Sequence, residues 1–136
     1  MTVETERQEA VARDIRERII RYNAEQAGEP NDERIVLSVR DSDGNLIAGL
    51  VALGFWNGLF VELLWVSEAH RGRGIGTSLL AAAEDRAREN GWQVCFLSTF
   101  DFQAPGFYLK LGYQQFGELT GSPPGHSRKW FAKWLS

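Results

Sequence analysis

The sequence predicts an α/β fold with a mixed, mostly antiparallel sheet, a parallel pair of strands at its centre and helices on both faces. Turn dipeptides separate three successive strand-like runs near the N-terminal half, which is typical of antiparallel hairpins. A strand, a helix and a strand then follow in order, and such a unit requires parallel pairing through a right-handed crossover. The 136 residues are enough for one core, so we expect a single domain over residues 1–136.

The composition is that of an ordinary globular enzyme or binding protein. The formal net charge of -3 argues against a nucleic-acid partner, which usually calls for a basic surplus. No apolar run approaches the roughly 18 residues that span a bilayer, and the N-terminus lacks the pattern of a signal peptide. One cysteine and 2 histidines argue against a disulfide framework and a structural metal site. We therefore expect a cytoplasmic protein without a metal, a nucleic-acid partner or a membrane partner.

The first predicted element is a helix over residues 5–26. Val11, Ile15 and Ile19 recur every four residues, which places them on one face of a helix. Gly28, just beyond this pattern, is a natural end for the helix.

Two strands are predicted next, over residues 34–40 and 46–56. The dipeptide Asp43-Gly44 lies between them and favours a tight hairpin turn. These two strands should therefore pair antiparallel.

A third strand is predicted over residues 59–66, after a second hairpin signal at Asn57-Gly58. This strand is apolar at every position except Glu62. A run of that kind is typical of a central strand that is covered on both faces. The single carboxylate inside it calls for a functional or structural explanation.

The C-terminal half alternates helices and strands. We predict a helix from about residue 74 to 90, a strand over 92–99, a short helix over 104–111 and strands over 113–117 and 127–135. A glycine directly follows each of the two helices, as is common at helix ends.

The turn from Arg71 to Gly76, which contains three glycines, joins the third strand to the following helix. The first N–H groups of a helix have no internal partner, and the helix dipole adds positive charge there. Glycines allow the backbone to approach an anion closely, so the turn is a candidate phosphate site.

Two common nucleotide motifs do not fit this turn. A Walker loop that starts at Gly72 would need its second glycine where Thr77 stands, and no lysine follows. A dinucleotide-binding motif would need glycine at Thr77 or at Leu79.

The pattern Arg71-x-x-Gly74-x-Gly76 resembles the signature of the GNAT superfamily of acyl-CoA-dependent N-acyltransferases. The resemblance covers residues 34–117 and includes the apolar strand before the turn. It also includes a second motif, in the family's order, which reads Phe107-Tyr108-Leu109-Lys110-Leu111-Gly112-Tyr113.

This resemblance implies that the central parallel strands splay apart and that acetyl-CoA is the cosubstrate, with no metal. The pyrophosphate would bind the main-chain N–H groups of the turn, and the pantetheine arm would follow the backbone of the preceding strand. The turn residues are Arg71, Gly72, Arg73, Gly74, Ile75, Gly76 and Thr77, and the strand residues are Trp65, Val66 and Ser67.

The resemblance also assigns catalytic roles. The Val66 N–H would stabilise the oxyanion of the tetrahedral intermediate. Tyr108 matches the family's tyrosine near the thioester sulfur, where a phenol could protonate the leaving thiolate. The alternative for Tyr108 is a core tyrosine that packs against the sheet.

Glu62 is a candidate general base. Alternation along the strand puts Glu62, Leu64 and Val66 on one face, within reach of an amine in the cleft. Burial would raise the pKa of the Glu62 carboxyl and make it a better base. A structural ion pair with an arginine is an equally good explanation.

Several further residues are candidates with a structural alternative for each. Asp101 stands where the family often has asparagine, and it should cap the short helix or face solvent, while Gln103 could contact the cofactor. His126 could line the acceptor site or act as a base, or it could be a surface residue. Phe55 and Trp56 precede a hairpin tip and could wall the acceptor pocket, or they could belong to the core.

The sequence thus predicts an N-acetyltransferase that moves an acetyl group from acetyl-CoA to an amine, most simply that of a small molecule, in a ternary complex. Alternatives are a non-catalytic acyl-CoA-binding sensor or scaffold and an enzyme directed at proteins or peptides. An exposed sheet edge could also pair two copies into a homodimer. The amine itself is not encoded in any motif.

Overall fold

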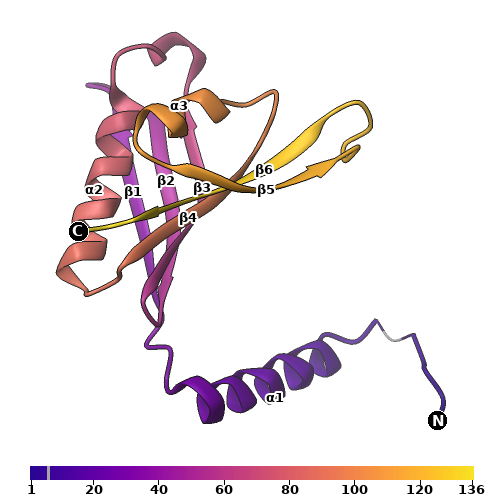
Figure 1. Ribbon diagram of the computed structural model, residues 1–136. Helices are drawn as coiled ribbons and strands as arrows, with labels where there is room; N and C mark the ends of the chain where they lie inside the picture. Colours follow the sequence, from indigo (N-terminus) through magenta and orange to yellow (C-terminus); the bar gives the residue numbers. More distant parts are fainter. Residues whose placement is uncertain (6) are drawn as a thin grey trace. The chain divides into compact units, whose positions relative to one another are not determined.

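A computed structural model describes residues 1–5 and 7–136 of the chain. These residues fall into two compact units, Met1–Pro30 and Asn31–Ser136, and each is described by itself (Figure 1). The expectation of one domain over the whole chain stays a prediction.

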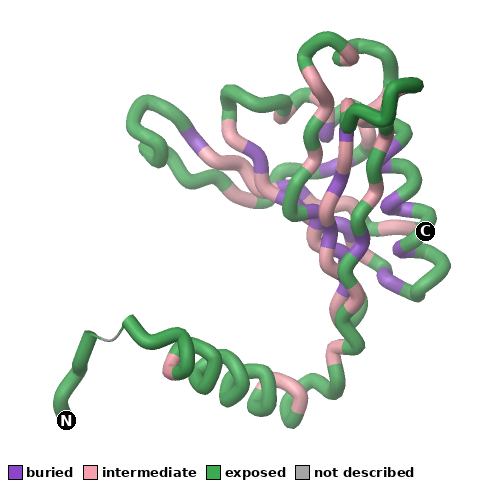
Figure 2. The backbone as a smooth tube through the Cα atoms, turned by 180° about the vertical axis from the view of Figure 1, so that it is seen from behind, coloured by how far each residue is buried: buried purple, intermediate pink, exposed green. Residues whose placement is uncertain are grey.

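The N-terminal unit contains one helix, α1 (Glu9–Ala27), so the helix begins later than the predicted residue 5. Gly28 ends it with φ of 84°, and the Gly28 N–H donates to the carbonyl of Ala24 at 2.9 Å. All residues of α1 are described and none is buried, and Ile15 and Ile19 of its apolar stripe are exposed (Figure 2). No helix in the described part of the chain has the length and apolarity that a membrane span requires.

The second unit is built on a six-stranded sheet with the order β1-β2-β3-β4-β6-β5. Neighbouring strands pair antiparallel except for β3 and β4, which are parallel. This confirms the predicted mixed sheet with a central parallel pair. The elements are β1 (Glu33–Arg40), β2 (Leu46–Phe55), β3 (Gly58–Val66), a short 3-10 helix (Glu68–His70), α2 (Ile75–Glu89), β4 (Val94–Phe100), α3 (Pro105–Lys110), β5 (Gln114–Thr120) and β6 (Ser127–Trp134).

The two parallel strands pair over a short stretch and then separate. Their register runs from Gly58 opposite Val94 to Phe60 opposite Phe96, and no later residue of β3 pairs with β4 within these fully described strands. The rest of β3 is bound only by β2 on its other side. An opening therefore forms between β3 and β4, bordered by backbone groups that the sheet does not use.

Within residues 31–136, all of which are described, both helices lie on the same face of the sheet. The first turn of α2 meets α3, since a Cβ at Gly76 would lie 3.4 Å from the Phe107 ring. On α3, the Tyr108 ring packs 6.0 Å from that of Phe131 on β6. Helices on both faces of the sheet therefore stay a prediction. The buried apolar residues are Ile35, Ala48, Leu50, Ala52, Leu59, Val61, Leu79, Leu80, Ala83, Ala87, Trp92, Cys95, Leu97, Tyr108, Tyr113 and Phe131.

A polar network fixes α2 to the sheet. Glu84 is only 6% exposed, and its carboxylate accepts hydrogen bonds from Tyr113 Oη at 2.8 Å and from Lys133 Nζ at 2.9 Å. A buried carboxylate without partners would cost free energy of folding, so these two hydrogen bonds allow the Glu84 carboxylate to be buried between α2 and the sheet.

The prediction that the third strand is covered on both faces is wrong for its second half. Glu62 is exposed, and the side chains of Leu63 and Trp65 are 63% and 47% exposed. A β-bulge at this point sets the register, so that Val51 faces Leu63 while Ala52 faces Val61. The strand β3 is apolar on both faces because one face packs against α2, while the other carries exposed apolar side chains.

The second hairpin turn is displaced by one residue from the dipeptide that predicted it. Phe55 pairs with Gly58, so the turn residues are Trp56 and Asn57, and Trp56 adopts φ of 50°. Gly58 instead begins β3 because a Cβ there would lie 3.2 Å from the Phe96 ring. Close packing between strands, and not turn geometry, thus explains this glycine.

Candidate active site

The glycine-rich turn has the backbone conformation that its sequence suggested. Gly72 and Gly74 adopt φ of 77° and 78°, which L side chains rarely do. Both positions face open space, since a Cβ would meet nothing within 4 Å. Their backbone is therefore strained for other residues and accessible to a ligand.

The N–H groups of this turn are free to bind an anion. Those from Gly72 to Thr77 form no hydrogen bond with any described residue, and the bond from Ser78 N to Gly74 O, at 3.0 Å, begins the ladder of α2. Free donors at a helix start, with the helix dipole behind them, favour a phosphate group. Arg71 precedes them, Arg73 lies among them, and both side chains are exposed.

The turn is tied to the end of β3. Arg71 Nε donates to the Val66 carbonyl at 3.1 Å. The Ser67 Oγ lies at hydrogen-bond distance, 2.7 Å, from His70 Nδ1 in the segment between them. A Cβ at Gly76 would also lie 3.7 Å from the Val66 side chain, so turn and strand are in close contact.

Main-chain hydrogen bonds distinguish the three strand residues that were predicted to meet the pantetheine arm. Ser67 N donates to the Ile47 carbonyl on β2 at 2.8 Å, so this N–H is already used. In an antiparallel pair, residues whose backbone groups bond to the partner strand alternate with residues whose groups point away from it. The backbone groups of Trp65 therefore face β2 and those of Val66 face the side of β4. Of the three, Val66 thus presents its N–H to the opening.

Tyr108 is a core tyrosine whose hydroxyl is not used by the fold. Its side chain is 8% exposed and its ring packs 5.9 Å from that of Tyr113. The Tyr108 hydroxyl forms no hydrogen bond with the described residues. Every fully buried polar side-chain atom among these residues does have a partner, so the hydroxyl cannot be fully buried and is accessible from the surface. Burial, with a smaller contribution from Cys95, raises the pKa of Tyr108 to about 12. The phenol is therefore protonated at neutral pH and can donate.

Glu62 differs from expectation in two respects. The expected burial is wrong, because the bulge places Glu62 as the extra residue of β3 and leaves it exposed. The expected shared face with Leu64 and Val66 is also wrong, because the bulge interrupts the alternation and only Leu64 and Val66 pack against the core. The alternative of an ion pair with an arginine finds no partner among the described residues. The carboxylate is thus free, two residues beyond the last parallel pair at Phe60.

Aromatic rings line the sheet where the opening begins. Phe60 and Phe96 stack with their centroids 5.2 Å apart, and Phe55 meets Phe96 edge-on at 6.2 Å. Trp56 lies 5.9 Å from Phe55 and is 39% exposed. Phe55 and Trp56 therefore belong to a partly open aromatic surface and not to the buried core.

Asp101 and His126 are brought together beyond the end of β4. Asp101 Oδ1 lies 3.0 Å from His126 Nδ1. The expectation that Asp101 faces solvent is confirmed, because the residue is exposed, but it does not cap the short helix α3, which has no side-chain cap. The Phe102 ring packs edge-on against His126 at 5.0 Å. The two partners are separated by most of the C-terminal region in sequence, which is why spacing did not reveal the pair.

Gln103 is used by the fold. Its Oε1 accepts hydrogen bonds from Phe100 N at 2.8 Å and from Thr99 Oγ1 at 3.1 Å. The amide oxygen thus closes the end of β4, and only the amide nitrogen remains for the predicted contact with the cofactor.

Sequence reasoning missed one cluster, formed by Ser98, Phe100, Arg128 and Trp130. Arg128 Nε donates to Ser98 Oγ at 2.8 Å, and the guanidinium lies over the rings of both aromatic residues. Arg128 and Trp130 alternate along one predicted strand, which was the available signal that they share a face.

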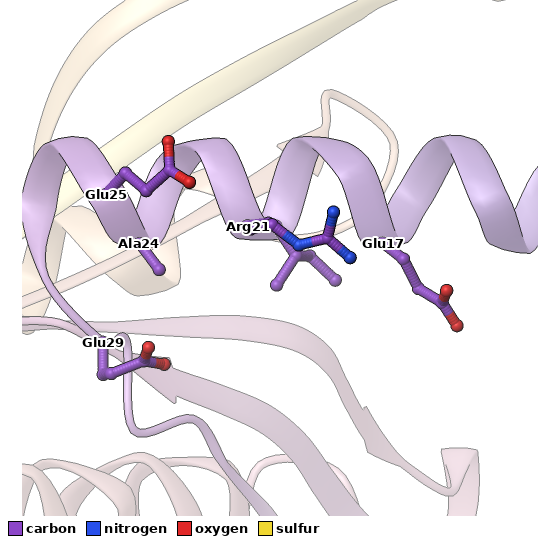
Figure 3. A pocket seen from close by; sticks show the side chains of 6 residues that line it. Glu17, Arg21, Ala24, Glu25 and Glu29 are labelled. Atoms are coloured by element: carbon purple, nitrogen blue, oxygen red, sulfur yellow. The ribbon is translucent and has the colours of Figure 1, made fainter.

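Two other features were not among the predicted site residues. Cys95 is fully buried, and burial raises the pKa of its thiol to about 11, so it is no ready nucleophile. A surface hollow on the N-terminal unit contains none of the predicted site residues (Figure 3). Its lining residues are Glu17, Ile20, Arg21, Ala24, Glu25 and Glu29.

Comparison with known proteins decides the family. The sequence model of the acetyltransferase (GNAT) family matches residues 3–113. The chain belongs to the GNAT acetyltransferase family. The match extends from the N-terminal unit through the turn and the motif that contains Tyr108.

Curated relatives of this GNAT protein carry acetyltransferase names. A blasticidin-S acetyltransferase of Streptomyces morookaense is 48% identical over 86 residues, which is 60% of this chain and 61% of that protein. An acetyltransferase of Agrobacterium fabrum (strain C58) is 34% identical over 119 residues, or 88% of this chain and 87% of that one.

Solved structures show the same fold. A crystal structure of an acetyltransferase from Bacillus cereus ATCC 14579 superposes with a TM-score of 0.91 and 31% identity, over 98% of each chain. The splayed strands and the turn of this GNAT protein thus belong to a fold that acetyltransferases share.

Proposed function

We propose that this chain is an N-acetyltransferase that transfers an acetyl group from acetyl-CoA to the amine of a small molecule. The observation that carries the proposal is the row of free N–H groups from Gly72 to Thr77, which begins six residues after the open N–H of Val66. A diphosphate with an extended, amide-containing arm suits both features. The name of the blasticidin-S acetyltransferase, whose acceptor is a small molecule, supports the acceptor class.

The turn would hold the diphosphate through its backbone. Several N–H groups at one helix start share the negative charge, and Arg71 and Arg73 add mobile positive charge. The arm would pass along the open edge of β3, where Leu64 and Val66 direct their backbone groups away from β2. It would thus extend the sheet in place of the missing contacts between β3 and β4.

In the proposed reaction the amine nitrogen attacks the thioester carbonyl carbon directly. A C–N bond forms, the C–S bond breaks, and the electron pair of that bond leaves on sulfur. The Val66 N–H would donate to the developing oxyanion. Glu62 would accept the proton that the amine loses, directly or through one water, and Tyr108 would protonate the thiolate.

The state of each group supports its assigned role. Glu62 has no ion-pair partner among the described residues, so its carboxylate is available as a proton acceptor. Tyr108 carries its proton at neutral pH because its pKa is raised to about 12. The buried Cys95 favours direct transfer over a route through an acyl-cysteine.

The test is a thiol-release assay with acetyl-CoA and a panel of amines, aminoglycosides, polyamines, amino acids and peptides. The proposal expects release that depends on a small-molecule amine. Glu62→Gln should lower kcat and change the pH–rate profile, and an unchanged profile would exclude Glu62 as the base. Acetyl-CoA that stabilises the protein against heat without any thiol release would favour a sensor, and release with peptides alone would favour a protein-directed enzyme.

A further inference from the structure

The cluster around Arg128 holds a guanidinium group in a fixed plane. Arg128 lies on β6, and its Nε donates to Ser98 Oγ on β4 at 2.8 Å. Its guanidinium carbon lies 4.8 Å from the Trp130 ring centroid and 5.5 Å from that of Phe100. One hydrogen bond and two aromatic faces thus restrict a side chain that is otherwise among the most flexible.

All four residues lie on the face of the sheet opposite α2. Ser98 pairs with Trp130 and Phe100 pairs with Arg128 across β4 and β6, and paired residues share a face. The preceding residue, Leu97, is buried on the α2 side. Arg128 itself is only half-buried, so its free nitrogens can reach solvent or a ligand.

This position borders the opening between β3 and β4. Parallel pairing ends at Phe96, and Ser98 is the next residue of β4 on the same face. The turn that would hold the diphosphate begins α2, which covers the other face. A cosubstrate held from the α2 side leaves the face with Arg128 for the acceptor, so this step rests on the proposed function.

The charge of Arg128 is not neutralised by the fold. None of the described carboxylates forms an ion pair with it, whereas Arg18 and Arg86 each have one and Arg88 has two. A guanidinium has five N–H donors in a planar fork that matches a carboxylate, and the hydrogen bond to Ser98 uses one of them. A fixed, unpaired fork beside an open site is suited to an anionic ligand.

We propose that Arg128 binds a carboxylate of the acceptor. The preferred acceptors are then molecules that carry the reacting amine at one end and a carboxylate at the other, as amino acids do. Arg128 acts as a specificity-determining residue, and Trp130 and Phe100 position it.

The experiment compares matched pairs of acceptors. Glycine, β-alanine, 4-aminobutyrate and 6-aminohexanoate are each assayed against their primary amides with saturating acetyl-CoA. Because a charge-assisted pair contributes well over a factor of ten in affinity, at least one acid should exceed its amide by about ten-fold or more in kcat/KM. Ratios near one for every pair in the wild-type chain would overturn the proposal.

Two variants separate recognition from packing. Arg128→Gln should bring the acid-to-amide ratio close to one, and Arg128→Lys should recover only part of it because a lysine lacks the planar fork. The control is Arg40→Gln, which removes an exposed arginine on β1. Among the described residues, this arginine donates to the Gly44 carbonyl and to no carboxylate, so the ratio should stay unchanged. A ratio that survives in Arg128→Gln would contradict the proposal.

A binding measurement keeps this inference separate from the proposed function. The Nε–H signal of Arg128 is assigned by NMR from its loss in Arg128→Gln, and each acid and amide is titrated into the full chain with acetyl-CoA present. A shift of this signal with acids and not with amides supports the carboxylate site. If no thiol is released in the assay, that absence counts only against the proposed acetyl transfer. An Arg128 signal that no acid moves would overturn the inference even if amines are acetylated.

Discussion

Arg71 Nε donates a hydrogen bond to the Val66 carbonyl at 3.1 Å, which joins the phosphate turn to the strand that borders the opening. Val66 turns both its carbonyl and its N–H away from β2. One residue thus receives the arginine on its carbonyl and offers its N–H to a ligand. The turn and the candidate oxyanion donor are therefore held in one geometry.

Arg71→Ala should weaken the binding of acetyl-CoA by about ten-fold, since a hydrogen bond from a charged group contributes on the order of 1.5–3 kcal/mol. The variant loses affinity for two reasons: it removes a positive charge near the phosphates, and it removes the hydrogen bond that holds Val66 in place. Titration calorimetry with acetyl-CoA measures it. Arg73→Ala is the matched control, because it removes the same charge from the same turn without a contact to β3, and an equal loss in both variants would exclude the positioning role.

Tyr108→Phe should lower kcat by about a hundred-fold at saturating substrates, with little change in KM, because general acid catalysis contributes about that much. The phenol donates only in the step that breaks the C–S bond. Steady-state kinetics checks this. Tyr113→Phe is the control, because the Tyr113 hydroxyl is bound to Glu84 within the core, and wild-type turnover in Tyr108→Phe would refute the assignment.

Tyr113→Phe should destabilise the fold by about 1–3 kcal/mol, because it leaves Glu84 Oε2 buried without its donor. Chemical denaturation gives the free energy of unfolding. Tyr22→Phe, at an exposed position on α1, should change stability by less than about 0.5 kcal/mol. Equal stabilities of the two variants would show that the Glu84 network contributes nothing.

Alkaline pH should destabilise the protein from about pH 9 upward. The pKa of Cys95 rises from 9.0 to about 11 and that of Tyr108 from 10.0 to about 12, in both cases mainly through burial. Because the folded chain holds these protons more tightly, the stabilisation is complete below the unfolded pKa values and is lost as pH rises through the folded ones.

Denaturation curves between pH 8 and 12 test this linkage. In Tyr108→Phe the decrease in the free energy of unfolding above about pH 10 should be smaller by on the order of 2 kcal/mol, since one titrating group is gone. Parallel curves for the variant and the wild-type chain would show that Tyr108 does not contribute.

The sequence predicted most of the fold because each element has a local signal. Alternation and turn dipeptides placed the strands, and the glycines of the phosphate turn were identified by their spacing. The positive φ of Gly72 and Gly74 is what that spacing encodes. Gly58 misled the turn prediction, because a glycine is needed at this position for close packing against Phe96 on the neighbouring strand. No local sequence pattern shows that contact.

The site was harder to predict where it depends on strand pairing. The register that offers the Val66 N–H and uses the Ser67 N–H follows from hydrogen bonds with β2, and the exposure of Glu62 follows from a bulge. Likewise, Asp101 meets His126, and Arg128 meets Ser98, only because β4 and β6 are neighbours. Long-range pairing of this kind leaves little trace in the local sequence.

The most direct test of the central claim is the affinity for acetyl-CoA of Gly74→Leu beside that of Gly91→Leu. Both glycines flank α2, with φ of 78° and 76°, and a Cβ at either meets nothing within 4 Å, so the strain of substitution is matched. Only Gly74 lies within the row of free N–H groups, where it is the N-cap of α2. The account predicts that calorimetry finds no acetyl-CoA binding to folded Gly74→Leu and wild-type affinity for Gly91→Leu. Wild-type affinity in Gly74→Leu would contradict it.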